Sequence, residues 1–184
     1  MDEKDMLEKV ESAIIMFFKC DSELMDVNAN ERSISHKLGE HLQAEFPKMN
    51  VDCEYNRRGE RVKKMNKIVE DSEPVLIDDT DGQTIFPDII MHRRRNDNEN
   101  LLVTEIKKST SRVSRNRDIE KLKVFTGDDF GYQVGLLIDI DVRAKRVNGV
   151  LCFQHGELQT RSEWYRIIGL CATEGNQDGG AKLQ

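Results

Sequence analysis

The sequence predicts an α/β (α+β) fold in which helices flank a mixed central sheet. Three observations carry this prediction. Residues 85–92 and 101–108 are two apolar runs joined by a polar loop, which is the pattern of a β-hairpin. Residues 118–126 have helical spacing and precede the apolar run 132–140, so a helix crosses between two strands that we expect to be parallel. Earlier in the chain, residues 5–46 contain two amphipathic helical patterns.

The region before the hairpin contains two predicted helices and a strand. The first helix covers residues 5–20, and its apolar stripe is so wide that it must pack on the core or on a second subunit. Residues 21–30 are a polar break. The second helix covers residues 30–46, with Asn30 as its N-cap. Residues 51–56 alternate between apolar and polar side chains and form the first predicted strand.

A long charged segment, residues 57–84, separates this strand from the hairpin. We expect it to be a functional insertion, because strand connections are usually much shorter. Within it, residues 60–69 are predicted to form a short helix. Near the end of the chain, residues 147–153 are predicted to form a strand, whereas residues 161–171 fit either a helix or a strand. Residues 173–184 are polar and rich in glycine, which predicts a disordered tail.

Length and composition fit one soluble domain over residues 1–172, with the extra N-terminal helix in residues 1–25. The chain has 184 residues, of which 38% are hydrophobic and 34% are charged. No apolar run approaches the ~20 residues of a membrane helix, and the acidic N-terminus is unlike a signal peptide. Four scattered cysteines without a CxxC pair indicate a reducing compartment and argue against zinc. These features predict a cytoplasmic protein with no membrane partner.

Three charged side chains stand on the two strands of the predicted hairpin. Asp88 follows Pro87, and after sixteen intervening residues come Glu105, Ile106 and Lys107. Side chains two positions apart share one face of a strand, so Glu105 and Lys107 should lie about 7 Å apart while Ile106 faces the core. A carboxylate and an ammonium group on a central strand are costly to bury unless they are paired or bind a ligand. A divalent metal ion and a phosphate group would suit this face.

The pattern of Pro-Asp on one strand and Glu, an apolar residue and Lys on the next resembles the PD-(D/E)XK nuclease superfamily. The resemblance covers residues 31–141 and implies a restriction endonuclease-like αβββαβ core. It implies that Asp88, Glu105 and the backbone carbonyl of Ile106 bind Mg²⁺ or Mn²⁺, which are hard cations that prefer oxygen ligands. It also implies that Lys107 contacts the attacking water and the scissile phosphate.

Two further carboxylates are candidates for the same centre. Related nucleases often supply one from the helix before the first strand, which makes Glu31 a candidate metal ligand and catalytic residue. An acidic residue at the start of a helix also simply suits the helix dipole, so both interpretations of Glu31 stay open. Glu54, on the first strand, would assist the metal or lie on an exposed edge.

Basic residues cluster around the motif although the formal net charge is −6. Residues 57–67 hold six basic side chains and residues 93–123 hold ten, whereas the acidic excess lies mainly elsewhere. Local positive potential matters more than the total charge for binding a phosphate backbone. The candidate nucleic-acid contacts are Arg57, Arg58, Lys108, Arg112, Arg115 and Lys121.

The sequence therefore predicts a metal-dependent DNA nuclease that hydrolyses phosphodiester bonds, by analogy in bacterial or phage DNA processing or defence. The expectation of DNA as the partner rests on the resemblance. Specificity would come from the segment 57–84, from a homodimer formed through the N-terminal helix, or from a protein partner. The alternative is a catalytically inactive nuclease-fold module that binds nucleic acid or a protein.

Overall fold

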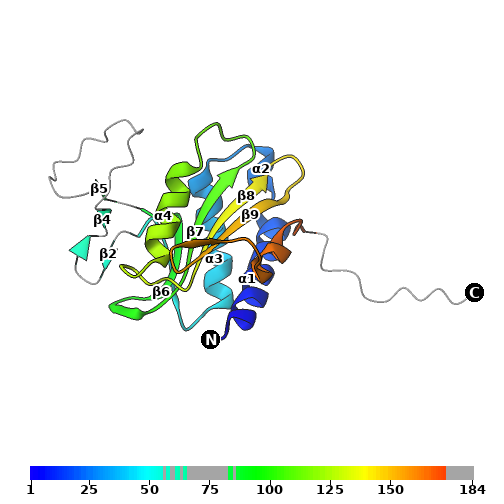
Figure 1. Cartoon of the computed structure of the whole chain (residues 1–184). Helices are drawn as coiled ribbons and strands as arrows, with labels where there is room; N and C mark the ends of the chain where they lie inside the picture. Colours follow the sequence, from blue (N-terminus) through cyan, green and yellow to red (C-terminus); the bar gives the residue numbers. More distant parts are fainter. Residues whose placement is uncertain (56, 59–60, 63, 66–82, 85, 173–184) are drawn as a thin grey trace, which may run out of the picture.

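The computed structural model describes residues 1–55, 57–58, 61–62, 64–65, 83–84 and 86–172. A six-stranded mixed sheet of order β1-β6-β7-β8-β9-β10 lies at its centre, with helices on both faces (Figure 1). The predicted α/β class is therefore confirmed. The strands of this sheet are β1 (Asn50–Cys53), β6 (Ile89–Arg93), β7 (Asn96–Lys108), β8 (Val134–Asp141), β9 (Arg146–Gln154) and β10 (Glu157–Gln159).

The pairing of the strands confirms the predicted hairpin and crossover. β6 and β7 are antiparallel, β7 and β8 are parallel, and β8 and β9 are antiparallel. β10 pairs with β9 and was not predicted, because its three residues are too short to show a periodicity. The turn before it, His155 and Gly156, has positive φ at both positions. That conformation is typical of a two-residue β-hairpin.

One face of the sheet is covered by α1 (Glu3–Asp21), α3 (Glu31–Glu45) and the 3₁₀ helix η1 (Glu163–Ile167). The structure thus assigns a short helix to the segment that fitted either a helix or a strand. A further helix of four residues, α2 (Glu23–Asp26), corrects the prediction that residues 21–30 form only a polar break. Met25 of α2 is buried, which explains why this short turn is held against the core.

The apolar stripe of α1 packs within the chain. Its members lie in one cluster with residues of α3, η1 and the sheet, so this face does not need a second subunit to cover it. The homodimer through this helix stays a prediction. The buried residues of the stripe are Met6, Leu7, Val10, Ala13, Ile14, Phe17 and Phe18.

The opposite face of the sheet is covered by α4 (Asn116–Thr126). Leu122 and Phe125 of this helix are fully buried in a cluster that also contains Val103 of β7. Alternation along β7 therefore turns Glu105 towards α4, whereas Ile106 lies in the cluster of α1 and α3. The predicted orientation of these two side chains is confirmed.

Only short pieces of the charged segment 57–84 are described. β2 (Arg57–Arg58) pairs with β3 (Arg61–Val62), and β4 (Lys64–Met65) pairs with β5 (Gln83–Thr84). The helix predicted over residues 60–69 is wrong at the described positions, because these residues form β-ladders instead. The predicted tail at 173–184 lies outside the described residues. Within the described part of the chain, no helix combines the length and the apolar character needed to cross a membrane.

A buried ion pair ties β1 to β6 at the outer edge of the sheet. His92 Nε2 lies 2.9 Å from Asp52 Oδ2, and Arg94 Nε donates to the same oxygen at 2.9 Å. The ring of Tyr55 packs on that of His92 with centroids 5.0 Å apart. Burial works to raise the pKa of Asp52, but the hydrogen bonds from His92 and Arg94 outweigh it and lower the pKa to about 2.

The Asp52→Asn variant is expected to lose about 1–2 kcal/mol of unfolding free energy at pH 7. Because the pKa is lower in the folded state, the carboxylate stabilises the fold above about pH 4 and loses its effect as the pH falls towards 2. Urea unfolding of both proteins from pH 7 to pH 3 should show the difference shrinking below pH 4. A difference that stayed constant to pH 3 would contradict this role, and Glu99→Gln in an exposed ion pair is the control.

Candidate active site

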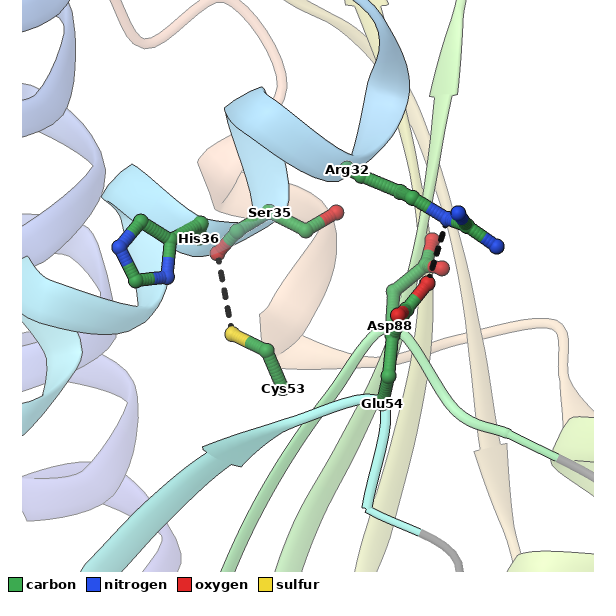
Figure 2. A pocket seen from close by; sticks show the side chains of 6 residues that line it. All are labelled: Arg32, Ser35, His36, Cys53, Glu54 and Asp88. Carbon is green, nitrogen blue, oxygen red and sulfur yellow. Dashed lines mark hydrogen bonds and ion pairs between the residues drawn. The ribbon is translucent and has the colours of Figure 1, made fainter.

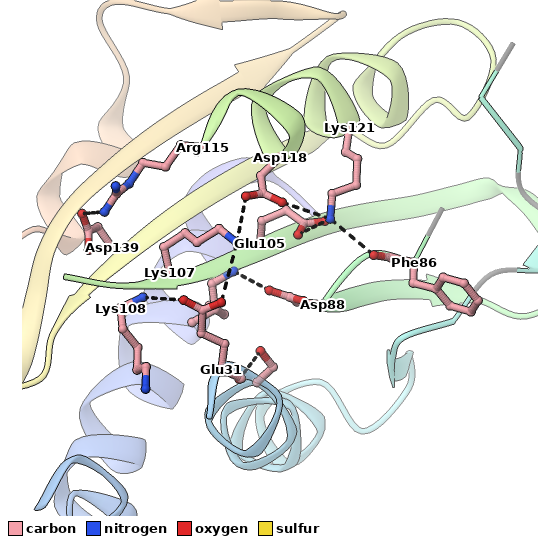
Figure 3. A network of polar contacts seen from close by, with 12 residues as sticks. Glu31, Phe86, Asp88, Glu105, Lys107, Lys108, Arg115, Asp118, Lys121 and Asp139 are labelled. Carbon is pink, nitrogen blue, oxygen red and sulfur yellow. Dashed lines mark hydrogen bonds and ion pairs between the residues drawn. The ribbon is translucent and has the colours of Figure 1, made fainter. Parts of the chain in front are cut away.

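The three residues of the sequence motif converge near the C-terminal end of β7. Asp88 stands immediately before β6, and its Oδ2 accepts a hydrogen bond of 2.7 Å from the backbone N–H of Ile106. That N–H lies between Glu105 and Lys107 in the chain, so Asp88 is fixed against the strand that carries both (Figure 3). Glu105 and Lys107 are buried on the α4 side of the sheet.

Glu31 reaches the same place from α3. The side chain of Asn30 accepts a hydrogen bond from Ser33 N at 2.8 Å and so begins the helix, as predicted. Glu31 Oε1 accepts from the backbone N–H of Lys108 at 3.1 Å, and Oε2 lies 3.6 Å from Lys107 Nζ. Glu31 therefore suits the helix dipole and also adds a carboxylate to the cluster.

A fourth carboxylate, Asp118 of α4, was not predicted. Asp118 Oδ2 lies 2.9 Å from Lys107 Nζ, and Oδ1 lies 3.2 Å from Lys121 Nζ. The sequence held one signal for it. Asp118 occupies the same helical stripe as Leu122 and Phe125, at spacings of four and seven residues, and a charge on an apolar stripe is costly unless it has a partner.

Lys121 was predicted to contact phosphate and instead lies inside the cluster. Its Nζ is 2.6 Å from Glu105 Oε2 and 3.5 Å from the carbonyl oxygen of Phe86. The Glu105 side chain is only 1% exposed, so this ion pair is almost completely removed from water. Such pairs hold only while every partner is present.

The cluster contains more negative than positive charge. Glu31, Asp88, Glu105 and Asp118 face Lys107 and Lys121, which gives a formal charge of −2.

The pKa values of four residues in the cluster are raised. Burial raises the pKa of Asp88, and burial together with the charges of Asp88 and Asp118 raises that of Glu105 well above its usual value. Burial works to lower the pKa of Lys107 and Lys121, but the neighbouring carboxylates outweigh it and raise both. The raised pKa values of Asp88 and Glu105 thus reflect mainly burial, whereas those of the two lysines reflect the neighbouring carboxylates.

An unsatisfied buried oxygen marks where a cation would fit. Glu105 Oε1 is buried and makes no hydrogen bond within the described residues. Such an atom is costly to bury, and ligation would relieve the cost. Among the described residues no group of three His, Cys, Asp or Glu side chains forms a ready-made metal cage. Mg²⁺ often binds proteins through one or two carboxylates and keeps several waters.

A cavity of about 270 Å³ opens beside Asp88 and connects the cluster to the surface. Its wall carries two arginines, Arg32 and Arg117, and the half-exposed ring of Phe86. Figure 2 shows that Arg32 also reaches Glu54, with its Nε 2.6 Å from Glu54 Oε1. Glu54 is thus an exposed rim residue paired with an arginine, as the second interpretation of this carboxylate expected.

The other predicted phosphate contacts are spread over different surroundings. Lys108 Nζ donates to Ala29 O at 2.7 Å and to Asn28 Oδ1 at 3.0 Å, so it braces the start of α3. Arg115 is paired with Asp139 at 2.7 Å. Arg112 is exposed on the connection between β7 and α4. Arg57 and Arg58 lie on β2, and their side chains are outside the described part of the structure.

The Asp118→Asn variant is expected to lose about 3 kcal/mol of unfolding free energy, because it removes the shared partner of two buried ammonium groups. Glu120→Gln is a matched control on the same helix, since Glu120 forms an exposed pair with Lys123. The control should change stability by less than about 0.5 kcal/mol. Urea unfolding at neutral pH measures both. Equal losses in the two variants would show that the buried cluster is no tighter than a surface pair.

No protein-family model matches the chain, and no curated protein matches it. The chemistry of the cluster follows from its own atoms. It presents carboxylate oxygens that can hold a hard cation, a buried ammonium group beside them, and a cavity with arginines through which a phosphate group can approach.

Proposed function

We propose that the protein is a metal-dependent phosphodiesterase that cleaves DNA and is built on a restriction endonuclease-like core. The observation that carries the proposal is the position of Asp88, which stands just before β6 and is hydrogen-bonded to the backbone beside Glu105 on the adjacent strand β7. A buried oxygen of Glu105 has no hydrogen bond within the described residues, and Lys107 lies on the same strand face.

The order of the elements supports the proposed core. Apart from the short strands β2 to β5 between β1 and β6, the elements come in the order αβββαβ, namely α3, β1, β6, β7, α4 and β8. The last two strands of that series are parallel neighbours. The charged residues sit where β7 meets the start of both helices. This agrees with the fold expected from the motif, although a mixed sheet of this size is compatible with other α/β folds.

In the proposed mechanism Asp88, Glu105 and the backbone carbonyl of Ile106 would hold Mg²⁺ or Mn²⁺. The bound ion would lower the pKa of a water molecule and offset charge on the phosphate group. Asp118 and Glu31 hold the Lys107 ammonium group in place, and they raise its pKa, so this side chain stays charged at neutral pH. Lys107 would thus orient the water and stabilise negative charge on the phosphate oxygens rather than act as a base.

The substrate would approach through the cavity beside Asp88. Arg32 and Arg117 on its wall would contact phosphates on either side of the scissile bond, and the exposed Arg112 would extend the basic surface. DNA rather than RNA is proposed on the strength of the motif. Either a protein partner or a homodimer would supply sequence or structure preference.

The Asp88→Asn variant is expected to lower the rate of plasmid nicking in Mn²⁺ by more than about 100-fold. Loss of a metal ligand should lower activity more than loss of a residue that only hydrogen-bonds to a ligand, which typically costs up to about 100-fold. Glu40→Gln is the matched control, because Glu40 is an exposed carboxylate on α3 that pairs with Lys37. Gel assays with plasmid and linear DNA, with EDTA as a blank, measure the rates. Cleavage that persists unchanged in both Asp88→Asn and Lys107→Met would defeat the site assignment.

A catalytically inactive nuclease-fold module is the second candidate, and one observation favours it. Lys121 already neutralises Glu105 at 2.6 Å, as a residue would in a centre that no longer binds metal. This candidate predicts no metal binding, whereas the proposed nuclease requires it.

Calorimetric titration with Mn²⁺ is expected to give site-specific heat for the wild-type protein and to lose it in Glu105→Gln, because the amide removes the anionic ligand. Glu99→Gln, an exposed carboxylate near the tip of the β6–β7 hairpin, serves as the control. Absence of specific heat in the wild-type protein would favour the inactive module.

A further inference from the structure

The ammonium group of Lys121 lies among three oxygen atoms that come from different elements. Glu105 Oε2 on β7 is 2.6 Å away, Asp118 Oδ1 on α4 is 3.2 Å away, and the carbonyl oxygen of Phe86 is 3.5 Å away (Figure 3). We call these three atoms the oxygen cradle. Two anionic oxygens and one carbonyl are the ligand types that hard divalent cations prefer.

Lys121 and Lys107 differ in their surroundings, although both pair with Asp118. Among the described residues, the ammonium group of Lys107 pairs with two carboxylates, those of Asp118 and Glu31. Lys121 also contacts the carboxylate that the proposed metal shares, Glu105, and a backbone carbonyl that has no charge to neutralise. An ammonium group in such surroundings takes the place that a metal ion would take.

Glu105 provides a second and independent observation. Its Oε2 is bound by Lys121, whereas its Oε1 has no hydrogen bond within the described residues. The side chain is only 1% exposed. The two oxygens of one carboxylate therefore have different roles. Oε2 belongs to the oxygen cradle, and Oε1 is free for the ion of the proposed centre beside Asp88.

We propose that the oxygen cradle is a second cation site in which Lys121 permanently replaces a metal ion, so that the centre binds one divalent ion per chain instead of two. The inference rests on the proposed function, because Glu105 bridges the two positions. It assigns Lys121 a positioning and charge-stabilising role beside the metal in place of the phosphate contact that the sequence suggested.

The test counts bound Mn²⁺ from the loss of the free-ion signal in electron paramagnetic resonance. Wild-type protein should bind one Mn²⁺, and Lys121→Met should bind one more, because methionine keeps the length of the side chain and removes its charge. Lys107→Met is the matched control, since it removes an equal charge from Asp118 but leaves the cradle filled, and it should keep a count of one. Adding Glu105→Gln to Lys121→Met should abolish both ions, because Glu105 bridges the two positions, whereas adding Asp118→Asn should abolish only the additional ion.

Several results would overturn the inference. Two ions in the wild-type protein would show that Lys121 does not fill the site, and this holds even if Lys121→Met fails to fold. A count of one in a folded Lys121→Met protein, with DNA cleavage by the wild type intact, would reject the cradle and leave the proposed function standing. No bound Mn²⁺ in any of the proteins would reject the proposed function together with the inference.

Discussion

The burial of Glu105 under α4 is the constraint on which the centre of this structure depends. A carboxylate on a central strand, shielded by a helix, loses its hydration, and the cost is several kcal/mol unless other groups replace the water. Lys121 replaces part of it at 2.6 Å. Because Lys121 is then itself a buried charge, Asp118 is required, and Asp118 in turn also holds Lys107. The buried charge of Glu105 thus explains Lys121, and the buried charge of Lys121 explains Asp118.

The topology of the sheet makes this chain of pairs possible. The crossover from β7 to the parallel strand β8 places α4 on the face towards which Glu105 and Lys107 point. α3 covers the other face, but its first turn reaches past the end of β7, so Glu31 contacts the backbone of Lys108 and the side chain of Lys107. Residues far apart in the chain therefore meet at one end of β7.

Local periodicity predicted much of this fold, and tertiary contacts explain what it missed. The hairpin, the crossover and the N-cap at Asn30 all follow from spacing within a few residues. The helical stripe of α4 marked Asp118 as a charge in need of a partner, but it could not identify that partner as Lys107, which lies on β7. The phosphate contact of Lys108 stays a prediction. In the structure its ammonium group donates to the carbonyl of Ala29, which is 79 residues away in the chain and which no local pattern could indicate.

The same imbalance that makes the cluster costly would give it affinity for a cation. The cluster has four carboxylates and two ammonium groups, and Glu105 Oε1 has no hydrogen bond within the part of the chain that the structure describes. If stability alone had shaped this centre, an amide or an apolar residue at one of the acidic positions would remove the excess. Retaining the excess next to a cavity with arginines on its wall makes sense when a positive ion and a phosphate group complete the charge balance.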